Sequence, residues 1–229
     1  TLTTEALQAR LASDSLGRAI AQRAAREQGR GVQRAINATG VVLHTGLGRS
    51  PVHPDVASAM AEAAQGYCVL EVDRFSGERN QRDDRLSTLL QRLLGCEAAI
   101  AVNNNAAALM LAVNTLADRR EVIVSRGELI EIGGSFRLPD LLQRSGAILR
   151  EVGTTNRTRV EDIAGAITRR TGLILRAHPS NYRIEGFTER PDLRALAVLA
   201  REKNVPLLED LGSGALLDLG AHGLPPEPT

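Results

Sequence analysis

The sequence has no apolar run long enough to cross a membrane, and it has only two cysteines. A helix that spans a bilayer needs roughly 20 consecutive apolar residues, and none of the 229 residues lie in such a run. No secretory signal opens the chain. Cys68 and Cys96 have neither the spacing of a metal site nor that of a disulfide framework. We therefore expect a cytoplasmic protein with no membrane partner and no metal site.

Lysine is nearly absent, because Lys203 is the single lysine among 28 basic residues. The excess of arginine is typical of a GC-rich genome, but it leaves only one candidate for any reaction that needs a lysine. The formal net charge is +1. Bulk charge therefore gives no sign of a nucleic-acid partner.

Helical and strand-like segments alternate along most of the chain. An Ala- and Arg-rich segment, 3–28, has helical spacing, and Thr158 and Glu161 predict a capping box. Further helices are expected at 53–65, 85–94, 105–116, 138–144, 158–170 and 192–202, and strands at 98–102, 121–125, 148–152, 173–177 and 205–210. This alternation predicts an α/β fold, a mainly parallel sheet covered by helices. Ligands of such sheets bind beyond the carboxyl ends of the strands.

A polar turn follows the first expected strand. Asn103, Asn104, Asn105 and Ala106 come directly after Val102 and open a helix. The free N–H groups and the positive end of a helix dipole suit a phosphate. The turn is not a P-loop, because it has no G-K-[ST] string. An ordinary N-cap with no ligand is an equally good interpretation.

Polar side chains also end two later strands. His178, Ser180 and Asn181 follow one strand, and Asp210 ends the next. A carboxylate at the end of a buried strand needs a partner. A pyridine ring nitrogen is one such partner, because an ionised carboxylate keeps that nitrogen protonated. The alternatives remain a structural histidine and a carboxylate that caps the following turn.

These strings together resemble the bacterial selenocysteine synthase (L-seryl-tRNA(Sec) selenium transferase) family. The resemblance runs from about residue 34 to the end, and its most specific string is S-R-G-E-L-I-E-I-G-G-S-F-R. The other matching segments are 36–42, 102–108, 151–157, 180–187 and 209–214. The resemblance implies an aspartate-aminotransferase-like large domain of a pyridoxal 5'-phosphate enzyme. The implied enzyme converts seryl-tRNA(Sec) to selenocysteinyl-tRNA(Sec) with selenophosphate, via an aminoacrylyl intermediate.

The resemblance also implies roles for single residues. The asparagine turn, 103–106, would lie around the cofactor phosphate, and Asp210 would pair with the ring nitrogen. Ser180 and Asn181 would face the phenolic oxygen of the ring, with His178 nearby. These residues are therefore the expected catalytic and cofactor-binding set.

Three arginines are the expected ligands of the selenophosphate anion. Arg49 matches one family motif, and Arg79 and Arg82 match a second basic motif. Paired hydrogen bonds from guanidinium groups suit such anions. Solvated surface arginines are the alternative. The sequence departs from the family at Gly46, where asparagine is common, and within 77–82.

The family's Schiff-base lysine lies in an S-G-D-K segment that does not occur here. Lys203 stands between a helix and a strand, on the side of the sheet away from the expected site. We expect a helical segment at 1–34 and a partial cofactor-binding domain at 35–229, without the lysine segment and the small C-terminal domain. Such a piece would be inactive alone, and the intact protein would be a homo-oligomer, at least a dimer.

Two other functions share this fold. The first is a pyridoxal-phosphate lyase that acts on a small amino acid or amino sugar, and the second is a scaffold relative without catalysis. Turnover without tRNA would favour the lyase. Absence of a downstream S-G-D-K segment would favour the scaffold.

Overall fold

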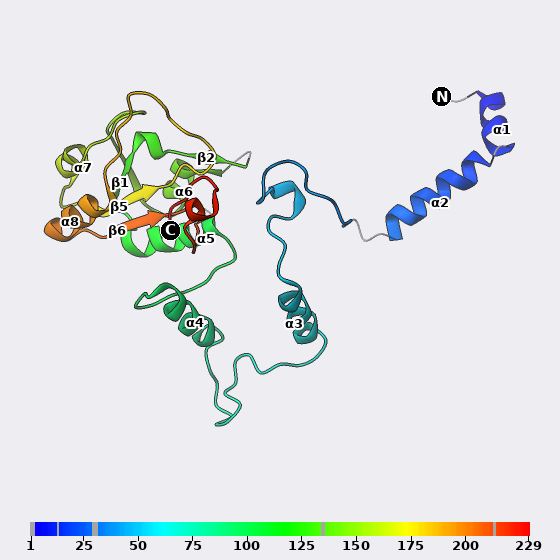
Figure 1. The fold of residues 1–229 in the computed structure, drawn as a ribbon, viewed down its shortest axis with the longest axis horizontal. Coiled ribbons are helices and arrows are strands. Elements are labelled where there is room, and N and C mark those ends of the chain that lie inside the picture. The colour runs from blue at the N-terminus through cyan, green and yellow to red at the C-terminus, as the bar shows by residue number, and fades with distance from the viewer. Residues whose placement is uncertain (1–2, 13, 29–31, 134–135, 213) are drawn as a thin grey trace. The chain divides into compact units, whose positions relative to one another are not determined.

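The computed structural model describes residues 3–12, 14–28, 32–133, 136–212 and 214–229 (Figure 1). The chain divides into two compact units, Thr1–Ser76 and Gly77–Thr229. In the described part of the chain, no helix has the length and apolar character to cross a membrane.

The first unit contains helices and irregular segments. Its helices are α1 (Thr4–Ala12), α2 (Ser15–Gln28), the 3₁₀ helix η1 (Thr45–Leu47) and α3 (Pro54–Ala64). The helix expected at 3–28 is therefore two helices. Leu11 and Ile20, which belong to the expected apolar stripe, are each 61% exposed. Among the described residues of this unit, the stripe consequently packs into no core.

The second unit contains the sheet. Its strands are β1 (Glu121–Ser125), β2 (Glu131–Ile132), β3 (Phe136–Arg137), β4 (Ile148–Val152), β5 (Thr171–Ala177) and β6 (Leu207–Asp210). Its helices are α4 (Asp84–Leu94), α5 (Asn105–Ala117), η2 (Arg126–Glu128), α6 (Leu138–Arg144), α7 (Val160–Ala166), α8 (Leu193–Lys203) and η3 (Leu219–His222).

The main sheet has the strand order β4-β1-β5-β6, and every neighbouring pair is parallel. Strands β2 and β3 form a separate antiparallel pair. Parallel strands need crossover connections, and the helices α6, α7 and α8 lie in the connections between successive strands of this sheet. All carboxyl ends of the four strands therefore lie at one edge of the sheet.

Helices cover both faces of the sheet (Figure 1). Side chains alternate along a strand, so Val122 and Val124 of β1 pack with α5 and α6, while Ile123 packs with α7 and α8. Leu173 and Ile174 of β5 divide between the two faces in the same way. The predicted α/β class with a mainly parallel sheet is therefore confirmed.

Two local expectations were wrong. Residues 98–102 form no strand, and they pair with no strand of the described chain. Helix α7 begins at Val160, two residues later than expected, and Arg159 with Asp162 replaces the predicted capping box of Thr158 and Glu161, because Asp162 accepts a hydrogen bond from the Arg159 N–H at 2.8 Å. It ends at Ala166, since the hydroxyls of Thr168 and Thr171 accept backbone N–H bonds and turn the chain into β5.

Candidate functional site

Asp210 lies at the carboxyl end of β6, and its side chain is held from two directions. The residue is 8% exposed. Its Oδ1 atom accepts hydrogen bonds from the Gly212 N–H at 2.8 Å and from Asn105 Nδ2 at 2.9 Å. No hydrogen bond reaches its Oδ2 atom from the residues that the structure describes. Among the described residues, one oxygen of this nearly buried carboxylate therefore has no hydrogen-bond partner.

The asparagine turn forms the first turn of α5. Asn104 is the N-cap, and its Oδ1 atom accepts the Ala107 N–H at 2.8 Å. Helix geometry leaves the N–H groups of Asn105 and Ala106 without an intrahelical acceptor. Asn103 lies in an exposed bend just before the cap. The turn is therefore an N-cap, and it also presents backbone N–H donors that suit a phosphate.

The tip of β5 lies beside the turn that follows Asp210. The His178 N–H donates to the Asp210 carbonyl at 2.9 Å. Gly212 has a φ of +68°, and an added Cβ there would lie 3.2 Å from Ser180 Cβ. This turn therefore needs glycine both for its backbone angle and for its close approach to Ser180. Asn181 Nδ2 donates to the Glu131 carbonyl at 3.0 Å.

The structure therefore joins three sequence segments that are far apart in the chain. Asp210, Asn105 and the β5 tip with His178 and Ser180 are neighbours, as the predicted cofactor site requires. His178 also contacts Glu227, with 3.1 Å between Nε2 and Oε2. The individual cofactor contacts of these residues stay predictions.

A cavity of about 560 Å³ opens at the same edge of the sheet. His178, Ser180 and Asn181 line it, together with polar residues that follow β1 and β4. Asp210 and the asparagine turn are not among its lining residues. The cavity thus lies next to the carboxylate, with the β5 tip between them.

A partly buried ion pair, with a buried carboxylate and a more exposed guanidinium, supports the β5 tip, and the sequence did not reveal it. Glu128 is 5% exposed, and its carboxylate accepts from Arg190 Nε at 2.7 Å and from the Ala177 N–H at 3.0 Å. Arg190 Nη2 in turn donates to the Ala177 carbonyl at 2.8 Å. Both polar groups of the last residue of β5 are therefore held by this pair. A glutamate three residues after a buried strand is the one sequence signal that could have drawn attention to it.

Tyr182 lines the same cavity and contacts the segment that contains Glu128. Its hydroxyl donates to the Gly127 carbonyl at 2.6 Å. Burial raises the pKa of Tyr182, and the negative charge of Glu128 raises that pKa further, against a lowering by Arg190. The neutral, donating form of the phenol is therefore favoured at this place.

The predicted substrate arginines belong to segments that precede α4 in the chain. Arg49 belongs to the first unit and has a φ of +64°. Arg79 and Arg82 are exposed in the irregular segment before α4. Lys203 is the last residue of α8 and precedes β6, whose far end carries Asp210. The single lysine therefore lies at the opposite edge of the sheet from the site, as predicted.

A solved structure has a similar fold. The structure of D-glucosaminate-6-phosphate ammonia-lyase matches with a TM-score of 0.61 and 23% identity, over 80% of this chain and 49% of that one. At this level of identity the likeness shows the fold alone. The likeness agrees with the predicted α/β fold of this domain.

Curated relatives match over most of the chain. L-seryl-tRNA(Sec) selenium transferases from Carboxydothermus hydrogenoformans, Desulfovibrio desulfuricans and Geobacter sulfurreducens are 51%, 54% and 48% identical. The matches cover 86%, 85% and 96% of this chain but only 42%, 41% and 47% of those proteins. The chain thus spans less than half the length of these relatives. A family model described as L-seryl-tRNA selenium transferase matches residues 35–229, and the chain belongs to that family.

Proposed function

We propose that the full-length protein converts seryl-tRNA(Sec) to selenocysteinyl-tRNA(Sec) with selenophosphate, using pyridoxal 5'-phosphate. Family membership and the name shared by the matching relatives support this reaction. The contact between Asn105 and Asp210 is the structural observation that carries it, because it brings a phosphate-type helix start beside a carboxylate with one oxygen available.

The residues at the sheet edge fit this cofactor. Asp210 Oδ2 would accept from the protonated ring nitrogen, and the N–H groups of Asn105 and Ala106 would bind the phosphate, with Asn103 and Asn104 around it. When bound, the cofactor withdraws electrons from the amino acid, so that the Cα proton and the serine hydroxyl can leave. Near burial of Asp210 keeps water from competing for its carboxylate.

The β5 tip would orient the other side of the ring. Ser180 and Asn181 would face its phenolic oxygen, and His178 lies where it could hold or move a proton near the substrate. The lysine anchor would come from outside these 229 residues, because Lys203 lies at the wrong edge of the sheet.

Arginines would bind the two anionic substrates, selenophosphate and seryl-tRNA(Sec). Arg49, Arg79 and Arg82 would bind selenophosphate, with loops that can serve a neighbouring subunit of a homo-oligomer. Exposed arginines of α2, such as Arg18 and Arg26, would add salt-dependent affinity for tRNA. Aminoacylated tRNA is a cytoplasmic substrate, which supports a cytoplasmic location.

Cofactor binding and turnover test the proposal in the full-length protein. We expect a visible cofactor absorption band after pyridoxal phosphate is added, and selenophosphate-dependent conversion of radiolabelled seryl-tRNA(Sec). Asp210→Ala should abolish conversion, whereas Asn114→Leu, on the same helix as the asparagine turn, should retain it. Absence of the band at every pH would refute the cofactor, and turnover of free serine without tRNA would indicate a lyase instead.

A further inference from the structure

The Asn105 amide group makes two hydrogen bonds that leave its orientation unambiguous. Nδ2 is 2.9 Å from Asp210 Oδ1 and 3.2 Å from the Gly212 carbonyl oxygen. Both partners are acceptors only, so the NH₂ group and not the amide oxygen must face them. The side chain of Asn105 therefore points at the carboxylate and at the turn behind it.

These hydrogen bonds restrict the terminal side-chain torsion of Asp210, which sets the direction of its carboxylate oxygens. The terminal torsion of an aspartate is broad, so a single donor leaves the direction of the second oxygen loosely defined. Gly212 N supplies one donor from the turn after β6, and Asn105 supplies another from α5. Two donors on the same Oδ1 atom, from different elements, hold the carboxylate plane and with it the direction of Oδ2.

We propose that Asn105 is a positioning residue that aims Asp210 Oδ2 at the ring nitrogen of the cofactor, and that its side chain is not a phosphate ligand. This inference rests on the proposed function. It separates the asparagine turn into two parts, in which backbone N–H groups serve the phosphate and the Asn105 side chain serves the opposite end of the cofactor.

A cofactor analogue separates the two roles of Asn105. In 1-deaza-pyridoxal phosphate a C–H group replaces the ring nitrogen, while the phosphate is unchanged. The dissociation constants of both compounds are measured on the full-length protein, the Asn105→Leu and Asn105→Ala variants, and the matched control Asn114→Leu. Asn114 lies on the same helix and also donates its amide N–H to a backbone carbonyl, that of Ser145 at 3.0 Å.

The expected result is a loss of preference for the natural cofactor. The unmodified protein should bind pyridoxal phosphate more tightly than the analogue. Both Asn105 variants should lower the ratio of the analogue's dissociation constant to that of pyridoxal phosphate by about tenfold, because the hydrogen bond from Asn105 to the charged Asp210 is lost. Asn114→Leu should keep the ratio. Circular dichroism checks that each variant folds, and Asn105→Ala adds no bulk should the leucine variant misfold.

Other outcomes would overturn the inference. If the Asn105 variants weaken both compounds equally, the side chain binds the phosphate or acts only on the fold. If the unmodified protein binds both compounds equally, Asp210 does not meet the ring nitrogen and Asn105 cannot aim it. If the unmodified protein binds neither compound, the proposed function itself fails. The first two outcomes refute only the role of Asn105 and do not refute the proposed function.

Discussion

Neutralising Glu128 should destabilise the protein far more than neutralising a nearby exposed glutamate. Glu128→Gln keeps the shape of the side chain but leaves it one good acceptor for two donors, Arg190 Nε and the Ala177 N–H. A hydrogen bond to a charged group contributes about 1.5–3 kcal/mol, and an unsatisfied buried donor costs about 1–3 kcal/mol. We therefore expect the free energy of unfolding to fall by about 3 kcal/mol, out of the roughly 5–15 kcal/mol that is typical of a domain.

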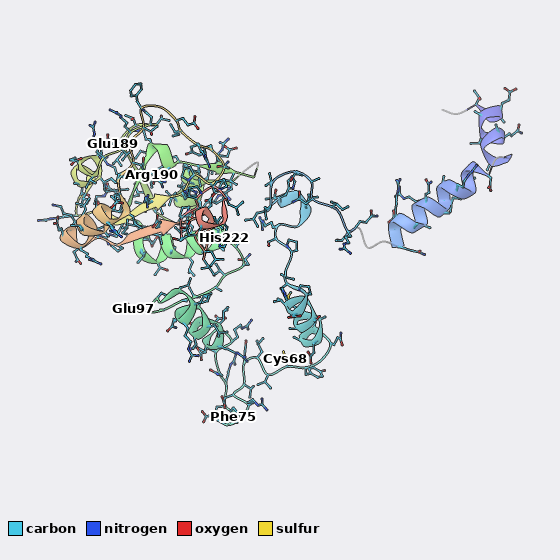
Figure 2. All side chains as sticks on the ribbon, in the orientation of Figure 1. Cys68, Phe75, Glu97, Glu189, Arg190 and His222 are labelled. Carbon is cyan, nitrogen blue, oxygen red and sulfur yellow. The ribbon has the colours of Figure 1, made fainter. Side chains whose placement is uncertain are left out.

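Glu189→Gln is the matched control, and its residue adjoins Arg190 (Figure 2). The Glu189 side chain pairs with Arg159 at 3.1 Å, but the two side chains are 45% and 55% exposed. Exposed pairs contribute about 0–1 kcal/mol because water and salt screen them. The same substitution chemistry is thus compared at a buried glutamate, whose arginine partner is 35% exposed, and at an exposed one.

Urea unfolding followed by circular dichroism measures both variants. The double variant Glu128→Gln/Arg190→Gln should cost less than the sum of its single variants, with a coupling of about 1–3 kcal/mol, because it leaves no unpaired guanidinium. Equal destabilisation by Glu128→Gln and Glu189→Gln, within about 0.5 kcal/mol, would show that the pair of Glu128 and Arg190 does not hold the β5 tip.

Three further predictions concern single side chains. Gly172→Ala should destabilise the protein by about 1–3 kcal/mol in urea unfolding, because the new Cβ would lie 2.9 Å from Ala117 Cβ; unchanged stability would refute this close packing. The raised pKa of Tyr182 should delay the ionisation of its phenol in an alkaline absorbance titration, and Tyr182→Phe should remove that late component. Because folding raises the pKa of Tyr182, the neutral phenol stabilises the folded protein fully below the pKa of about 10 of an unfolded tyrosine. This contribution to the free energy of unfolding is lost as pH rises through the pKa of the folded protein. A titration with no late component would contradict the raised pKa. Arg49→Ala should raise the KM for selenophosphate in the full-length protein and leave cofactor affinity unchanged, and an unchanged KM would exclude Arg49 from that site.

Local patterns were sufficient for most of the sheet. The ranges 121–125 and 148–152 agree with β1 and β4, because short β-branched runs between helical segments have few other structures open to them. The run at 98–102 has a similar composition but forms no strand. A strand needs a neighbour to bond its backbone, and no local pattern reveals whether that neighbour is present.

The sequence by itself determined the α/β class, the family and the position of the candidate site at the carboxyl ends of the strands, because periodicity and strings of residues are local properties. Only the tertiary structure decided which side chains meet there. Asn105 reaches Asp210 across 105 positions of sequence, and Glu128 reaches Arg190 across 62. Such contacts depend on strand order and helix packing, which place distant segments within hydrogen-bond distance, and no local pattern names the partner of either residue.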